Sequence, residues 1–139
     1  MRARPQDQAQ IRKLENDLFF ARALIIQLTG PKTSDILTAP ADLKSSGDVH
    51  RWFRGAVEQI LEITETITID EGLCKSLRAA CPLCGGSAND FYRLGPGYKF
   101  PVGLRRHLLG AHNSYQCQVA QEAVAHALAR VEIGEQLGI

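Results

Sequence analysis

The hydrophobic positions near the start of the chain recur at alternating gaps of three and four residues. This spacing keeps apolar side chains on one side of an α-helix and is typical of a coiled-coil seam. It predicts a helix from Asp7 to Leu28, and the seam consists of Ile11, Leu14, Leu18, Ala21, Ile25 and Leu28. A second apolar stripe, formed by Phe19, Phe20, Ala23 and Ile26, indicates that this helix packs on two sides. The seam could therefore join two chains in a dimer or belong to a bundle within one chain, and Asp17 and Arg22 could pair across a parallel dimer.

Helical spacing returns after a connector at residues 31–47 that is rich in proline and small polar residues. We expect a helix capped by Asp48, with its apolar face at Val49, Trp52, Phe53, Ala56, Val57, Ile60 and Leu61. We prefer its continuation through the β-branched residues 63–69 over a strand, and a short helix or turn over residues 73–80. A last helix, capped by Asn113 or Ser114, should bury Val119, Ala123, Val124, Ala127, Leu128 and Val131.

Between these segments, four side chains with metal-binding chemistry form two close pairs. Cys81 and Cys84 are separated by two residues, and His107 and His112 by four. Two thiolates from a tight turn and two imidazoles from a helix end can bind one Zn²⁺ ion. We expect Cys74 and Cys117 to be small buried hydrophobic residues, although Cys117 could replace a histidine as a ligand. Because four protein ligands leave no open coordination position, the zinc, one ion per chain, should be structural and no catalytic residue is expected.

The spacing of these residues resembles the two-cysteine, two-histidine zinc finger family. Leu104 lies three residues before His107, where the finger helix usually carries a leucine. The chain has 22 residues between Cys84 and His107, whereas the family usually has about twelve. The resemblance therefore implies a single variant finger with an enlarged loop. Short extended segments at 89–94 and 98–100 would form its hairpin, and its helix would run from Pro101 to about Gly110.

Together these elements predict a mostly α fold, namely a helical bundle with an N-terminal heptad helix and one small ββα-like zinc finger. The expected units are the amphipathic helix at 1–30, a linker at 31–47 and a helical core at 48–80. The zinc-finger module at 81–112 and a C-terminal helix at 113–139 complete the chain.

Charge is unevenly distributed although the net charge is only +1. Residues 73–112 carry six basic groups and one acidic group, which gives +5, whereas residues 31–72 carry four basic and eight acidic groups, which gives −4. The candidate contacts to nucleic acid or a protein partner are Arg93, Lys99, Arg105 and Arg106. The finger resemblance places Phe100, Gly103 and Arg106 at the base-reading positions. Only Arg106 can make a bidentate contact to guanine, so sequence-specific DNA binding by this finger alone is not expected.

We therefore expect a zinc-stabilised, non-enzymatic protein-interaction module that forms a homodimer and binds an unidentified protein or nucleoprotein complex. By analogy, such a protein could be a phage or mobile-element regulator or inhibitor of a host nucleic-acid complex, as in an anti-CRISPR role. The alternative is a dimeric DNA- or RNA-binding regulator, and an HNH-like nuclease using His112 and Asn113 is least favoured. The chain shows no signal-peptide or membrane-span pattern, so we expect a cytoplasmic protein in a reducing compartment, with no small-molecule substrate and no disulfides.

Overall fold

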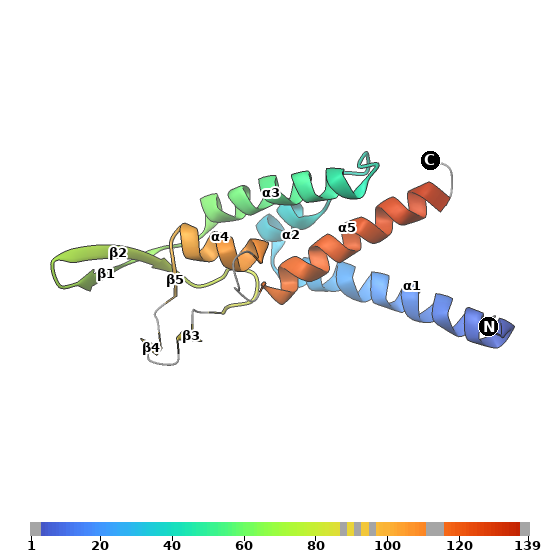
Figure 1. The fold of residues 1–139 in the computed structure, drawn as a ribbon, viewed down its shortest axis with the longest axis horizontal. Helices are drawn as coiled ribbons and strands as arrows, with labels where there is room; N and C mark the ends of the chain where they lie inside the picture. The colour runs from blue at the N-terminus through green and yellow to red at the C-terminus, as the bar shows by residue number, and fades with distance from the viewer. Residues whose placement is uncertain (1–3, 87–88, 91–92, 95–96, 111–115, 137–139) are drawn as a thin grey trace.

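The computed structural model describes residues 4–86, 89–90, 93–94, 97–110 and 116–136. It confirms the mostly α fold (Figure 1). The helices are α1 (Pro5–Leu28), α2 (Pro31–Leu37), α3 (Ser46–Ile63), α4 (Val102–Leu109) and α5 (Gln118–Gln136). The strands are β1 (Ile67–Glu71), β2 (Cys74–Ala79), β3 (Asn89–Asp90), β4 (Arg93–Leu94) and β5 (Tyr98–Lys99). No described helix is long and apolar enough to cross a membrane.

Helix α1 forms as predicted and packs on α5 through part of its second apolar stripe, whereas Phe20 of that stripe is exposed. Ile26 is buried, the Phe19 ring stacks on His126 with centroids 4.4 Å apart, and the Arg22 Nε donates to the Glu122 carboxylate at 2.7 Å. The helix ends at Leu28 with Thr29 as its C-cap, and Gly30 takes a φ of 102° before Pro31 begins α2. This positive φ suits glycine because residues with a β-carbon rarely adopt it. Residues 31–47 thus hold a seven-residue helix inside the predicted linker.

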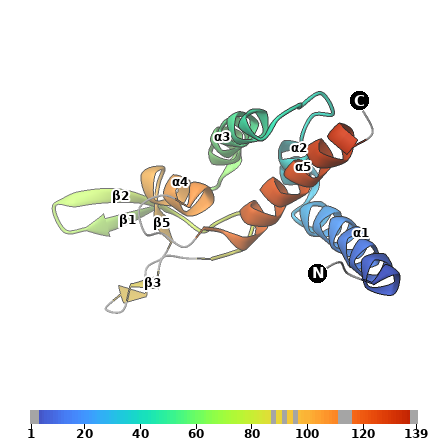
Figure 2. The same cartoon turned by 45° about the vertical axis from the view of Figure 1, so that its right-hand side comes forward.

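Most of the heptad seam of α1, in contrast, is exposed, and only Ile25 is half-buried. The exposed fractions are 50% for Ile11, 58% for Leu14, 46% for Leu18 and 76% for Leu28. Figures 1 and 2 show α1 crossing α5, after which the two helices diverge toward the N-terminal end of α1. The fold within one chain therefore uses the second stripe and leaves the seam available.

His126, at the centre of the α1–α5 contact, makes the stability of the fold depend on pH. Burial, followed by the positive charges of Arg130 and Arg22, lowers the pKa of His126. The unfolded chain binds this proton more readily, so stability falls as the pH drops through the unfolded value of about 6.5, and the loss is complete below the folded pKa. His126→Phe keeps an aromatic ring on Phe19 but cannot titrate. Between about pH 7.5 and about pH 5.5, its free energy of unfolding in urea should fall less than that of the wild type, and an equal fall would contradict this role of His126.

Helix α3 begins three residues earlier than predicted, because its N-cap is Ser45 and not Asp48. Ser45 is the N-cap, and its Oγ accepts from the Asp48 backbone N–H at 3.1 Å. The Asp48 carboxylate in turn accepts from the Lys44 backbone N–H at 3.1 Å. Capping by Ser45 satisfies an N–H that the first helical turn would otherwise leave without a partner. The predicted apolar face of α3 is confirmed, with Val49, Phe53, Ala56, Val57, Ile60 and Leu61 buried.

The preferred helix over residues 63–69 is wrong, as is the short helix or turn over residues 73–80. Helix α3 ends at Ile63, and β1 pairs with β2 in an antiparallel hairpin from Ile67↔Arg78 to Glu71↔Cys74. The β-branched residues of this stretch lose less side-chain freedom in a strand than in a helix. The resulting hairpin projects from the helices (Figure 1).

The predicted finger hairpin is paired differently from the expectation. Strands β3 and β4 pair with each other, whereas β5 pairs with β2 through Arg78↔Lys99 and Ala79↔Tyr98. The ββα-like element therefore consists of β2, β5 and α4, and its first strand precedes the cysteine pair.

One cluster of buried residues joins the helices to the metal-binding segment. Helix α5 contacts both α3 and α1 and lies between them (Figure 2). The cluster includes Phe53, Ile60, Leu104, Leu108, Cys117, Ala120 and Ala123. Of the buried face predicted for α5, Ala123 and Ala127 are buried, whereas the larger residues at 119, 124, 128 and 131 are half-buried. Ala120, which was not predicted, is fully covered. The segment that carries the cysteines and α4 thus shares its core with the helices.

Candidate metal centre

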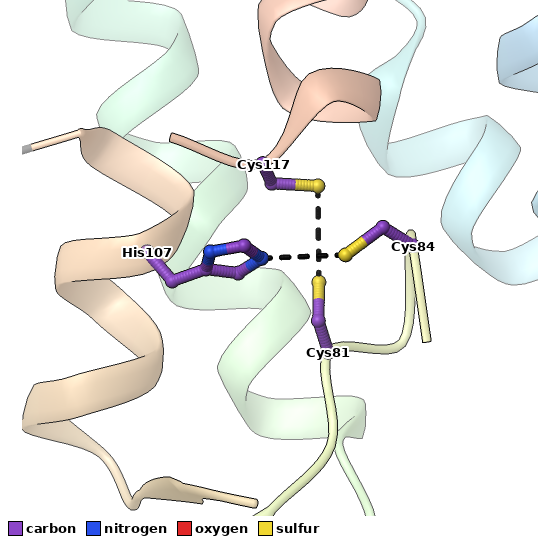
Figure 3. A group of neighbouring side chains, drawn as sticks. All are labelled: Cys81, Cys84, His107 and Cys117. Carbon is purple, nitrogen blue, oxygen red and sulfur yellow. Dashed lines mark hydrogen bonds between the residues drawn. The ribbon is translucent and has the colours of Figure 1, made fainter. Parts of the chain in front are cut away.

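Four side chains with metal-ligating atoms meet where β2, α4 and α5 come together. They are Cys81, Cys84, His107 and Cys117, and their ligand atoms all lie within 4.8 Å of one another. Figure 3 shows the three sulfur atoms and the imidazole pointing toward a common centre. Cys81, His107 and Cys117 are buried and Cys84 is exposed. The group can hold a metal ion at a largely buried position.

The first two ligands come from a tight turn directly after β2. The Gly85 N–H donates to the Cys81 carbonyl at 2.8 Å, and the Cys81 N–H donates to the Gly86 carbonyl at 2.9 Å. The Gly86 N–H also donates to the Cys84 sulfur at 3.3 Å. Gly85 has a φ of 71°, and a β-carbon on Gly86 would lie 3.1 Å from the Cys84 sulfur. The two glycines therefore allow the chain to fold back around the thiols.

The third ligand, His107, comes from the buried face of α4. Leu104, the leucine that the finger resemblance singled out, is fully buried beside it, as is Leu108. The His107 Nε2 lies 3.3 Å from the Cys84 sulfur, and its Nδ1 lies 3.1 Å from the Tyr98 hydroxyl. The Tyr98 and His107 rings also stack, with centroids 4.4 Å apart. With Nε2 facing the centre, Nδ1–H can donate to the Tyr98 oxygen, which fixes the ring and its tautomer.

Cys117 supplies the fourth ligand from the residue just before α5. Its sulfur is buried 3.9 Å from that of Cys81, and its backbone N–H donates to the His107 carbonyl at 2.8 Å. We had predicted that Cys117 is a small buried hydrophobic residue, and a metal ligand only as an alternative. The structure places it in the ligand group, whereas the predicted ligand His112 lies outside the described residues. The prediction that Cys74 is buried is wrong, because Cys74 is exposed on β2, and it does not belong to the group.

The separations between the ligand atoms suit a tetrahedral metal ion. An ion with metal–sulfur bonds of about 2.3 Å and metal–nitrogen bonds of about 2.0 Å places its ligand atoms about 3.5–3.8 Å apart. The Cys84–His107 and Cys81–Cys117 separations of 3.3 Å and 3.9 Å are close to these values. Three thiolates and one imidazole also complete four-coordination without a water or substrate.

The thiols influence one another's protonation even without a cation. The hydrogen bond from Cys81 lowers the pKa of Cys117 to about 4, and the same bond, together with burial, raises the pKa of Cys81. Burial is also the main cause that raises the pKa of Cys84. One thiolate thus forms readily, while further negative charge in this buried group is unfavourable. A bound cation favours deprotonation of all three because metal coordination stabilises thiolates.

The basic residues predicted to contact a partner differ in their interactions within the chain. Arg105 forms a two-point ion pair with Glu58 of α3, at 2.8 Å and 3.1 Å, and its hydrogen bond is the largest cause lowering the pKa of Glu58. Arg105 therefore joins α4 to α3. Lys99 and Arg106 are exposed on β5 and α4, and the side chain of Arg93 lies outside the described residues.

The hydrogen bond from His107 to Tyr98 should contribute to metal affinity. Tyr98→Phe preserves the stacked ring and removes only the hydroxyl that accepts from Nδ1. Loss of such an outer partner typically weakens metal binding by about 10- to 100-fold. Competition with a chromophoric zinc chelator measures this change. Unchanged affinity in Tyr98→Phe would show that stacking alone orients His107.

Comparisons with known proteins found no relative of this chain. No protein-family model, no curated protein and no solved structure matches the chain. The functional assignment therefore depends on the chemistry of the metal centre and on the surfaces that the fold leaves exposed.

Proposed function

We propose that this chain is a zinc-stabilised, non-enzymatic protein-interaction module. The observation that carries the proposal is the closed set of four ligands, Cys81, Cys84, His107 and Cys117, at the junction of β2, α4 and α5. A metal with four protein ligands has no position for a reacting water, so its role is to hold segments together. As in a zinc finger, the proposed ion holds a cysteine turn against a helix, but here a third cysteine takes the place of the second histidine.

Zinc is the metal that best suits this donor set. Thiolates are soft ligands, imidazole is a borderline one, and tetrahedral combinations of the two are typical of zinc. The four ligands come from three separate segments, and a single ion would connect them. Because the β5–α4 unit is small, the ion would supply stability that apolar burial there cannot provide alone.

An exposed apolar surface supports the assignment to protein interaction. Ile11, Leu14 and Leu18 are about half exposed on consecutive turns of α1, and Leu28 is more exposed still. Single exposed leucines are ordinary, but a contiguous apolar stripe marks a surface that binds another protein. The finer proposal of an inhibitor of a host nucleic-acid complex, carried by a phage or mobile element, rests on analogy with small single-finger proteins.

Metal analysis combined with an activity test examines this proposal. The purified protein should contain one zinc per chain, and removal of the metal by a chelator should unfold α4 and the cysteine turn, as followed by circular dichroism. Zinc-loaded protein should leave plasmid DNA and RNA intact in the presence of Mg²⁺. Nuclease activity that disappears in His107→Ala, or protein that keeps its full stability without metal, would overturn the proposed function.

Nucleic-acid binding is the second candidate because Lys99 and Arg106 lie exposed on neighbouring segments of the ββα-like element. Binding through phosphates would weaken steeply with added salt. Titration of duplex and single-stranded DNA at two salt concentrations, with Arg106→Ala and the exposed α3 variant Arg54→Ala as its matched control, separates the candidates. Salt-dependent binding that is lost only in Arg106→Ala would favour a nucleic-acid regulator.

A further inference from the structure

The exposed seam of α1 is separate from the face that packs inside the chain. Phe19, Arg22 and Ile26 contact or approach α5, whereas Leu14 and Leu18 are open. In a helix with 3.6 residues per turn, the face formed by these α5-facing residues is centred about 100° from the seam. The helix thus has one apolar face used by its own chain and another with the a and d spacing of a coiled coil.

A groove beside the seam extends its apolar surface onto α5. The groove has a volume of about 430 Å³ and lies between the two helices, with Leu18, Phe19 and Ile133 among its lining residues. Ile133 is 44% exposed. Glu15 and Arg22 also line the groove, which gives it charged margins. A helix laid on the seam would therefore cover apolar atoms of both α1 and α5.

The charges that flank the seam fit a parallel second copy of the same helix. In a parallel pair Asp17 of one copy faces Arg22 of the other, because these residues occupy g and e positions five residues apart. In an antiparallel pair with the six seam residues fully overlapped, Asp17 would face Asp17 and Arg22 would face Arg22. Like charges in these positions oppose association. The charge pattern therefore favours the parallel arrangement.

The structure also holds Arg22 ready for this contact. Its Nε donates to Glu122 at 2.7 Å, which fixes the side chain at the edge of the seam. A guanidinium carries five N–H donors, so the Arg22 side chain can bind a second carboxylate as well. The α1 backbone is already ordered by α5, which reduces the entropic cost that a short isolated coiled coil would bear.

From these observations we infer that two copies of this chain associate in parallel through the α1 seam, with Asp17 of each copy bound to Arg22 of the other. This inference rests on the proposed function, since it names the protein that the interaction module binds. A second copy of the chain matches both the spacing of the seam residues and the charges that flank them.

Light scattering and sedimentation on the zinc-loaded full chain test the association. The wild type should be dimeric at tens of micromolar, and Leu14→Asp should raise the dissociation constant by about 100-fold or more, because it buries a charge in each copy. The matched control is Phe20→Asp, which changes another exposed apolar residue of α1 outside the seam. A monomeric wild type, or equal weakening by both variants, would overturn the inference.

Cysteine crosslinking tests the orientation. In a background of Cys74→Ser, which removes an exposed thiol, Leu14→Cys should form a covalent dimer on mild oxidation because a parallel seam pairs residue 14 with itself. Phe20→Cys should remain uncrosslinked. If Leu14→Cys fails to crosslink while Leu14→Cys combined with Ile25→Cys does, the helices are antiparallel and the parallel inference is wrong.

The outcomes separate this inference from the proposed function. A monomeric protein that contains one zinc and unfolds on chelation would contradict only the dimer. A dimer that lacks stoichiometric metal would contradict only the zinc-stabilised module. Circular dichroism of Leu14→Asp should match the wild type because Leu14 is exposed, so any loss of association is not caused by unfolding.

Discussion

The Cys117→Ala variant is expected to lose stoichiometric zinc and to unfold the region around α4, whereas His112→Ala should retain both metal and fold. The reason is that Cys117 already completes a four-membered ligand group with Cys81, Cys84 and His107. Structural zinc contributes about 10–16 kcal/mol in small zinc domains, and whole domains are stable by only about 5–15 kcal/mol. Loss of one ligand can therefore decide whether this region folds.

Metal content and thermal melting of the two variants measure the difference. Cys74→Ala serves as the control because Cys74 is an exposed cysteine outside the ligand group. It should bind zinc and melt like the wild type. The reverse result, in which His112→Ala loses the metal and Cys117→Ala keeps it, would restore the finger-like ligand set that the sequence spacing favoured.

Gly97→Ala should cause the second large effect, because Gly97 is where the chain passes closest to β2. Its φ is 142°, and a β-carbon there would lie 2.6 Å from the carbonyl carbon of Ala79 and 2.7 Å from its oxygen. Backbone atoms cannot move aside as a flexible side chain can. Backbone strain of about 1–3 kcal/mol and overpacking of about 1–3 kcal/mol together predict a loss of about 2–6 kcal/mol. Zinc affinity should fall too, because Tyr98 follows directly and contacts His107.

A second glycine provides the matched control for this variant. Gly72, in the turn between β1 and β2, has a φ of 74°, but a β-carbon there would meet no atom within 4 Å. Gly72→Ala should therefore cost only the backbone strain, about 1–2 kcal/mol, and leave zinc binding unchanged. Chemical denaturation and chelator competition compare the two. Equal losses of stability would mean that the approach to Ala79 is not what restricts residue 97.

The sequence was most informative where helical periodicity and short-range spacing act together. Helix α1 and the apolar face of α3 follow from spacing alone, and α5 lies where its small apolar residues placed it. Cys81 and Cys84 are close in sequence and therefore close in any fold. His107 was predicted from its spacing to His112 and from Leu104 three residues before it, and both Leu104 and His107 are buried on α4.

The parts of the fold and of the metal centre that were not predicted depend on contacts between segments distant in the sequence. The β1–β2 hairpin was missed because residues 60, 63 and 67 also match helical spacing, and only pairing with residues 74–78 favours the strand. Cys117 lies ten positions after His107, just before another helix, so its spacing made it only a secondary candidate for a ligand. Its N–H bond to the His107 carbonyl brings the two together. A cysteine at the start of a small-residue helix was the available signal.

The position of Cys117 just before α5 connects the candidate metal centre to the contact between α5 and α1. Helix α5 is anchored at its start by a ligand of the metal centre and, further along, holds α1 through Glu122 and His126. Zinc binding and self-association through α1 would therefore be thermodynamically linked. If zinc strengthens the pairing of two chains by some factor, pairing must strengthen zinc binding by the same factor. The supply of zinc would then set how much of the protein is assembled.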